Sequence, residues 1–185
     1  MHSDPKPSGD HPPLIWIDME MTGLEPSTCH IIEIASLVTD DSLKIIAEGP
    51  NLVIHQPDEV LMAMDAWCTE HHGLSGLTDA VRASRISLAA AERETLLFLE
   101  RYCPAGRSPL CGNSVWQDRR FIDAYMPSLS QFLNYRTVDV STFKELVRRW
   151  YPHLEIPEKK ETHRALDDIL ESVEELRFYR RTVMR

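Results

Sequence analysis

The order of β-rich and helical segments is the feature that most narrows the fold of this chain. Residues 14–20, 30–39 and 43–54 are rich in β-branched and aromatic side chains, and only short stretches separate them. They predict a three-stranded meander. Further along the chain, helical patterns alternate with two short apolar segments. This order predicts an α/β fold, with a mixed five-stranded sheet flanked by helices.

The helical patterns beyond the meander differ in strength. The most amphipathic one predicts a helix at residues 87–102, with Ser87 as its N-cap. Ser114 and Gln117 have the spacing of a capping box, whereas the polar stretch at residues 75–84 indicates a connection. The remaining helices are expected at residues 58–67, 114–126, 142–150 and 163–179, and the last two strands at residues 109–112 and 135–140.

Length and composition indicate one domain. The chain has 185 residues, of which 43% are hydrophobic, enough for a single sizeable core. We expect a disordered tail at residues 1–13 and a single domain at residues 14–185. No segment reaches the roughly 20 apolar residues of a membrane span, and the start lacks the features of a secretory signal. The sequence therefore predicts a soluble protein without membrane contacts.

The four cysteines are scattered through the chain without the CxxC spacing of a zinc site. A chain of this size does not need disulfides for stability. Reduced cysteines and a cytoplasmic location are therefore expected, and the sequence leaves a mitochondrial form open.

A net charge of −9 argues against broad electrostatic binding of long nucleic acids, which depends on many lysine and arginine contacts to phosphates. Paired arginines occur at residues 119–120, 148–149 and 180–181, and each pair is expected on a solvated helix face. A nucleic-acid substrate would therefore have to be short, or be held through metal ions.

Asp18 and Glu20 are the first candidate site residues. They are two apart in a predicted strand, so their side chains point to the same face, roughly 7 Å apart along the chain. Two like charges beside apolar neighbours would be costly if buried without a partner, so a cation is expected there. A solvated face on an edge strand is the alternative.

Asp118 interrupts an apolar helical stripe. Its neighbours at helical spacing are Val115, Ile122 and Tyr125, which are expected to face the core. A carboxylate in that place must be hydrogen-bonded, neutral or bound to a metal. A hydrogen bond within the helix is the alternative to a metal site.

The last predicted helix contains two adjacent acids that helical geometry separates. Asp168 shares a stripe with Ala165 and Leu176, whereas Asp167 lies on the charged face. Asp168 is therefore predicted to point inward and Asp167 to solvent. His163 stands at the start of this helix, where its role is either structural or catalytic.

These residue types suit the hydrolysis of a phosphodiester. Two divalent cations about 4 Å apart are well suited to this reaction, and such hard cations prefer carboxylate oxygens. A histidine with a pKa near 6.5 is able to take a proton from water at neutral pH. The four acids therefore predict a two-metal site, with His163 as its general base.

The motifs that contain these residues resemble those of the DEDDh 3′→5′ exonucleases: DME in the first strand, GNSVWQDRRF, and HRALDD at the last helix. Longer segments, such as WIDMEMTGLEP and YRTVDVSTFKELVRRWYP, resemble the oligoribonucleases, or small fragment nucleases. The resemblance covers about residues 14–180. It implies an RNase H-like exonuclease fold, two Mg²⁺ or Mn²⁺ ions per site, a homodimer, and release of 5′-mononucleotides from very short single-stranded RNAs, dinucleotides included.

The resemblance also implies roles for individual residues. Asp18, Glu20, Asp118 and Asp168 correspond to the metal ligands, and His163 corresponds to the base. Leu24 matches a wedge between two bases, and Trp67 and His72 match side chains that line the nucleotide. The polar groups that cap the 5′ phosphate of the substrate correspond to Ser114, Arg136, Ser141 and Thr142. Tyr135 corresponds to a residue that the partner subunit contributes.

Alternatives remain for several of these residues and for the function. Leu24 and Trp67 would otherwise be core residues, and Tyr135 would pack within its own subunit. Lys159 and Lys160 lie in a connection before His163, without a fixed role. The competing functions are a proofreading-type exonuclease acting on DNA or RNA and a non-catalytic nucleotide-binding module. The presence of all four acids and of His163 argues against a non-catalytic nucleotide-binding module.

Overall fold

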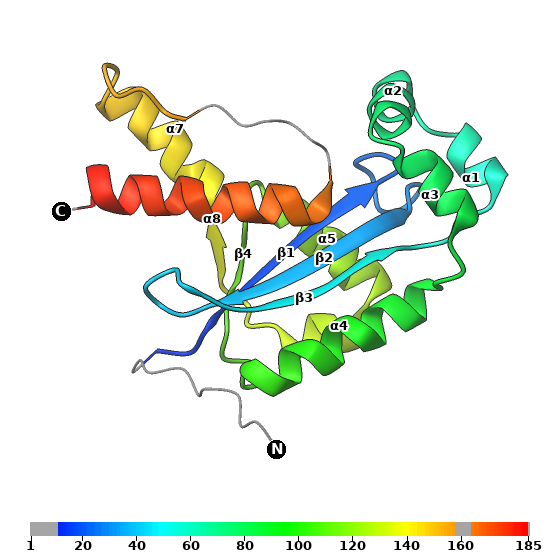
Figure 1. Ribbon diagram of the computed structural model, residues 1–185, viewed down its shortest axis with the longest axis horizontal. Coiled ribbons are helices and arrows are strands. Elements are labelled where there is room, and N and C mark those ends of the chain that lie inside the picture. Colours follow the sequence, from blue (N-terminus) through cyan, green and yellow to red (C-terminus); the bar gives the residue numbers. More distant parts are fainter. Residues whose placement is uncertain (1–10, 158–163, 185) are drawn as a thin grey trace.

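The computed structural model describes residues 11–157 and 164–184, and its centre is a mixed five-stranded sheet (Figure 1). The strand order is β3-β2-β1-β4-β5. The first three strands are antiparallel, and β4 and β5 continue the sheet parallel to β1. The predicted fold class is confirmed. The strands are β1 (Leu14–Met21), β2 (Ile31–Thr39), β3 (Ile45–Val53), β4 (Leu110–Gly112) and β5 (Thr137–Asp139).

Helices cover both faces of this sheet. In Figure 1, α8 crosses one face, α4 lies along the other, and α1 to α3 stand near the end of β1. The helices are α1 (Asp58–Met62), α2 (Ala66–Leu74), α3 (Leu77–Ala83), α4 (Leu88–Tyr102), α5 (Trp116–Tyr125), α6 (Pro127–Phe132), α7 (Val140–Trp150) and α8 (Ala165–Thr182).

The period-2 alternation of β1 divides its side chains between two cores. Ile15 and Ile17 pack into the core that includes α4, α5 and α6, whereas Trp16 packs into the core beneath α7 and α8. Because alternate side chains share a face, Asp18 and Glu20 lie on the side of Trp16. The sheet therefore presents both acids to α8.

Two sequence predictions around α2 and α3 are wrong. The helix expected at residues 58–67 ends at Met62, because Asp65 starts a new helix by accepting a hydrogen bond from the Cys68 amide at 2.8 Å. The stretch at residues 75–84, expected as a connection, contains α3. Leu77 and Val81, four residues apart, are fully buried, so packing of one face outweighs the polar composition.

The predicted capping box at Ser114 does not form. Ser114 has a φ of 50°, in the left-handed region, so it lies outside α5 and its hydroxyl caps nothing there. The Gln117 side chain turns away and donates to the carbonyl of Leu24. The Ser87 cap of α4 is confirmed, with its hydroxyl accepting from the Ala90 amide at 3.2 Å.

All four cysteines are free, as expected, and three of them are buried. Among the residues that the structure describes, no helix has the length and apolar character needed to span a membrane. The arginine pairs at residues 148–149 and 180–181 are exposed on their helices, as predicted. In the pair at residues 119–120 only Arg120 is exposed, because the Arg119 side chain is 23% exposed and donates to the carbonyl of Asn134.

Candidate active site

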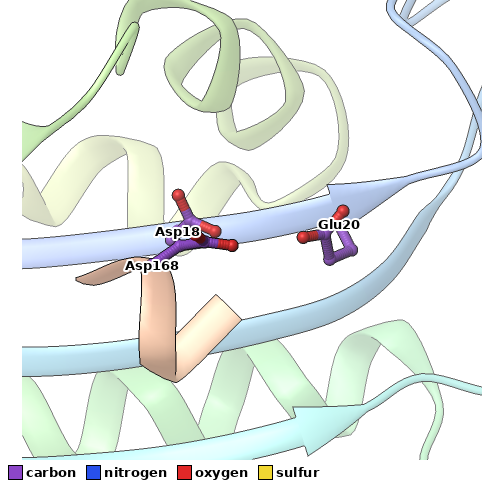
Figure 2. Close-up of side chains that lie close together, drawn as sticks. All are labelled: Asp18, Glu20 and Asp168. Carbon is purple, nitrogen blue, oxygen red and sulfur yellow. The ribbon is translucent and has the colours of Figure 1, made fainter. Parts of the chain in front are cut away.

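Three carboxylates meet where β1 passes under the start of α8. One oxygen each of Asp18, Glu20 and Asp168 lies within 4.8 Å of the others. Figure 2 shows Asp18 and Glu20 on the same strand, with Asp168 beside Asp18. Asp167 is exposed, so the helical assignment of Asp168 to the inside and Asp167 to solvent is confirmed.

Asp118 approaches the same strand from its edge. Its side chain is buried, at 6% exposure, and Oδ1 accepts a hydrogen bond from the Met19 amide at 3.0 Å. In β1, Ile15 and Trp16 pair with β4, so Asp118 reaches β1 beyond that pairing. The fourth acid thus lies beside the backbone segment that joins Asp18 to Glu20.

Burial and neighbouring acids make the ionised forms of these carboxylates costly. Burial raises the pKa of Glu20 to about 8, and Asp168, Glu33 and Asp118 add to this shift. Burial likewise raises the pKa of Asp118 to about 8, although its hydrogen bonds act in the opposite direction. Hard divalent cations favour carboxylate oxygens, so this donor set fits such ions, and their charge would restore the ionised carboxylates.

His163, Lys159 and Lys160 lie outside the described residues. The chain is described again from Arg164, whose carbonyl accepts a hydrogen bond from the Asp168 amide at 3.1 Å. The residue that follows His163 is therefore joined directly to the first turn of α8. That turn contains the ligand candidate Asp168.

Leu24 lies in the turn that follows β1, and hydrogen bonds from α5 fix the backbone of this turn. Its side chain is 73% exposed, so the core alternative for Leu24 is wrong. Its carbonyl accepts hydrogen bonds from Gln117 and Arg120 of α5, and Arg120 also pairs with Glu25 at 3.2 Å. A large apolar side chain is thus held in solvent by a fixed backbone.

Trp67 and His72, both on α2, differ in exposure. Trp67 is 54% exposed, which excludes a core role, and its ring stacks on His71 with centroids 4.0 Å apart. His72 is buried, with Nε2 2.9 Å from the carbonyl oxygen of Met21 and Nδ1 3.9 Å from Glu20. His72 therefore ties α2 to the end of β1, directly behind one of the acids.

Ser114 and Ser141 are brought together by a residue that connects β5 to α7. Asp139 Oδ1 accepts from the amides of Ser114 and Ser141, each at 3.0 Å, and from the Ser141 hydroxyl at 2.6 Å. Thr142 follows on the exposed side of α7. These residues follow β4 and β5, and the carboxyl ends of parallel strands are the usual ligand edge of a sheet.

Tyr135 and Arg136 precede β5, at the other end of that strand from Ser141. Tyr135 is 75% exposed, so it is not packed within its own subunit. The Arg136 guanidinium lies over its ring, 4.7 Å from the centroid. The pair forms an exposed aromatic and cationic projection.

The exonuclease family model matches residues 15–176. Oligoribonuclease of Shewanella sp. (strain W3-18-1) is 58% identical over 173 residues, which cover 93% of this chain and 96% of that protein. The chain belongs to the exonuclease family, among the oligoribonucleases. Oligoribonuclease of Marinobacter nauticus is also 58% identical to this exonuclease, over 90% of this chain and 93% of its own.

Solved structures support the same fold. Exonuclease I from Methylocaldum szegediense matches this exonuclease with a TM-score of 0.68 and 18% identity over 94% of the chain. The zinc-bound complex of E. coli exonuclease I with single-stranded DNA matches with a TM-score of 0.70 and 16% identity over 95%. The chain spans only about two fifths of these proteins, 41% and 42%. The exonuclease fold and the acidic cluster together indicate the use of divalent metal ions.

Sequence reasoning missed two residues that organise this site, Glu33 and Asp139. Glu33 was visible as a single acid in the apolar run HIIEIASL. Asp139 was visible as an acid near the end of the strand predicted at residues 135–140, shortly before the helix predicted at residues 142–150. Arg164, the partner of Glu33, and Ser114, one partner of Asp139, lie far along the chain, so spacing alone did not reveal these contacts.

Proposed function

We propose that this 3′→5′ exoribonuclease removes 5′-mononucleotides from very short single-stranded RNAs, dinucleotides included. The observation that carries the proposal is the cluster of Asp18, Glu20 and Asp168 within 4.8 Å, in a chain 58% identical to an oligoribonuclease. A net charge of −9 agrees with a substrate that offers few phosphates.

We assign the metal ligands to Asp18, Glu20, Asp118 and Asp168, which would hold two Mg²⁺ or Mn²⁺ ions. When bound, such ions activate water and stabilise the leaving 3′ oxygen. The four carboxylates would hold these ions near the end of β1, where the scissile phosphate would bind. Asp118 also fixes the backbone between the first two ligands through the Met19 amide.

His163 is the proposed general base. It would accept the proton of the attacking water, and an imidazole with an ordinary pKa near 6.5 is suited to this at neutral pH. Its sequence position supports the assignment, because the next residue begins the turn that holds Asp168.

The side chains proposed to contact the nucleotide surround the acids in the complex. Leu24 would separate the two bases, and the exposed Trp67 ring would contact the nucleotide. His72 would act from behind, holding Glu20 and the end of β1 in place. Apolar and aromatic surfaces suit bases of any sequence, because every base offers a π-face.

The 5′ end of the substrate would be capped by Ser114, Ser141 and Thr142. Arg136 lies at the other end of β5 from Ser141, beside Tyr135, so its guanidinium would reach this cap from the partner subunit. Hydroxyls near the start of α7 and a guanidinium are suitable donors for a phosphate. Tyr135 would come from the partner subunit of a homodimer. A capped 5′ phosphate leaves room for few nucleotides, so the cap limits the length of the substrate.

We also propose that residues 14–185 act as one domain and that the enzyme works in the cytoplasm. The family match over residues 15–176 supports the first statement, and the four free cysteines support the second.

The proposal is tested with 5′-labelled RNAs of two to about ten nucleotides, in Mg²⁺ and with a chelator. We expect fastest hydrolysis of the 5′-phosphorylated dinucleotide and none with the chelator. Asp168→Asn should abolish cleavage, whereas Asp167→Asn, the matched change one residue away on the exposed face, should preserve it. Equal rates on a dinucleotide and on long RNA would contradict the short-substrate assignment.

A proofreading-type exonuclease acting on DNA is the second candidate. Its support is the fold similarity to exonuclease I structures that contain single-stranded DNA. Long single-stranded DNA is therefore included in the same assay. Degradation of this DNA as fast as the RNA dinucleotide would favour the second candidate.

A further inference from the structure

Glu33 is a charged residue in the centre of the sheet. It lies in β2 with 0% exposure and stands directly opposite Glu20 in the antiparallel pairing of β1 and β2. A carboxylate buried to this extent requires a cation or several hydrogen-bond donors. Both are provided by the beginning of α8.

The cation beside Glu33 is the guanidinium of Arg164, which contacts the carboxylate through two nitrogens. Its Nε lies 3.1 Å from each carboxylate oxygen of Glu33, and its Nη2 lies 2.7 Å from Oε1. The planar guanidinium thus fixes both the distance and the orientation of the pair. The contact joins positions 131 residues apart in the chain.

Glu33 also takes the place of a helix cap. The N-cap position of α8 is Arg164, which makes no side-chain capping hydrogen bond within the helix. Instead the Ala165 amide donates to Glu33 Oε2 at 3.3 Å. A carboxylate at this position satisfies an otherwise unpaired amide and interacts favourably with the helix dipole.

The capped end of α8 carries one of the three clustered acids. The Asp168 amide donates to the carbonyl of Arg164 at 3.1 Å, so Asp168 sits one turn from the Glu33 contact. Glu20 is placed by β1, which pairs with the strand that carries Glu33. The Glu33–Arg164 pair therefore joins α8 to β2, and through the pairing of β2 with β1 it connects the two elements that supply the acids.

We propose that Glu33 and Arg164 are a positioning pair, which holds Asp168 against Asp18 and Glu20 at the separation that a divalent cation requires. The inference rests on the proposed function, in which these three acids are metal ligands. Neither member of the pair is itself a ligand. Loss of groups that orient metal ligands typically lowers metal affinity by about 10- to 100-fold.

A purely electrostatic role predicts a different pattern. Arg164 is a cation beside an acidic site, so loss of its charge alone would tighten cation binding. Loss of the Glu33 charge alone would weaken it. Positioning predicts weaker binding for both changes, and also for Arg164→Lys, which keeps the charge but loses the planar fork.

The test measures Mn²⁺ binding to metal-free protein by the electron paramagnetic resonance signal of free Mn²⁺. The variants are E33Q, R164Q, R164K and the double variant E33Q/R164Q, with folding checked by circular dichroism. We expect each to bind Mn²⁺ about 10- to 100-fold more weakly than the unaltered protein. The control is R82Q, which breaks the exposed pair between Arg82 on α3 and Asp58 on α1.

The double variant removes both charges and so avoids an unpaired buried carboxylate, in case R164Q fails to fold. Tighter binding in R164Q, or unaltered binding in R164K and in the double variant, would overturn the positioning role. Failure of the proposed function is distinguishable, because the unaltered protein would then bind Mn²⁺ without cleaving an RNA dinucleotide.

Discussion

Asp118 Oδ1 accepts a hydrogen bond from the backbone amide of Met19 at 3.0 Å, and Met19 stands between the two acids of β1. This contact joins α5 to β1 three residues beyond Trp16, the last residue of β1 that pairs with β4. Asp118 therefore has a structural partner as well as a proposed metal. The two roles can be separated by substitution.

Asp118→Asn should abolish metal-dependent cleavage while preserving the fold. Asparagine keeps an oxygen that is able to accept from Met19, but it loses the charge that a cation needs. Cleavage of a 5′-phosphorylated RNA dinucleotide, together with circular dichroism, measures both effects. Asp123→Asn, on the exposed side of the same helix, is the control. Full activity in Asp118→Asn would exclude Asp118 as a metal ligand.

His163→Ala should lower the rate by roughly 10²- to 10⁴-fold, because a positioned general base contributes about that much. Mn²⁺ affinity should stay the same, since a base is not a ligand. Single-turnover cleavage and Mn²⁺ titration of the same preparation give the two numbers. His153→Ala, at an exposed position, serves as the control. A parallel fall of affinity and rate would assign His163 to the metal instead.

The acids of the site were largely predictable because their signals are local. Helical periodicity separated Asp168 from Asp167, and an apolar stripe identified Asp118 as a buried acid. Strand alternation placed Asp18 and Glu20 on one face. These rules act over a few residues, so the sequence is sufficient for them.

Other features depend on contacts between distant segments and were not predictable. Ser114 has capping-box spacing, but its left-handed backbone is set by the packing of the loop after β4, where its amide donates to Asp139. Glu33 is explained only by Arg164, 131 residues later. The helix at α3 was missed because its polar residues concealed one buried face.

The metal-free protein should lose stability as the pH rises from about 4 to 8. The pKa values of Glu20 and Asp118 rise from 4.5 and 3.8 to about 8 on folding. Between these limits the folded state binds more protons than the unfolded state, so the free energy of unfolding falls with increasing pH. The stabilisation is complete below about pH 4 and is lost through pH 8.

Thermal unfolding at pH 5 and pH 8, with EDTA or with Mg²⁺, measures this effect. We expect Mg²⁺ to raise the Tm more at pH 8, where the acids must ionise. Asp118→Asn removes one of the two titrating groups and should flatten the pH dependence in EDTA. A Tm in EDTA that increases steadily from pH 5 to pH 8 would contradict the assignment.

Asp139→Ala should weaken recognition of the 5′ phosphate, because Asp139 holds Ser114 and Ser141 together. We expect KM to rise about tenfold for a 5′-phosphorylated dinucleotide, equivalent to about 1.4 kcal/mol. The unphosphorylated dinucleotide should show little change. Asp139 also caps α7, so its loss costs stability as well. Ser87→Ala removes the comparable cap of α4 and should leave both KM values unaltered.

Tyr135→Ala should reduce dinucleotide cleavage without changing the oligomeric state. Tyr135 is 75% exposed and stacks with Arg136, so its ring is free of contacts with its own core. If the ring completes the partner's site, its loss removes a substrate contact from each active site of the dimer. Sedimentation velocity gives the mass, and kinetics on a 5′-phosphorylated dinucleotide give kcat and KM.

Mixed dimers distinguish a contribution in trans from one in cis. If Tyr135 acts in trans, a dimer made only of Tyr135→Ala subunits is impaired, and a dimer made only of Asp168→Asn subunits is inactive. In a mixed dimer, the site with intact acids belongs to the Tyr135→Ala subunit and receives Tyr135 from its Asp168→Asn partner. Activity should therefore recover to about half of the unaltered level for trans action. No recovery, or a fully active monomer, would place Tyr135 in its own subunit's site or outside the reaction.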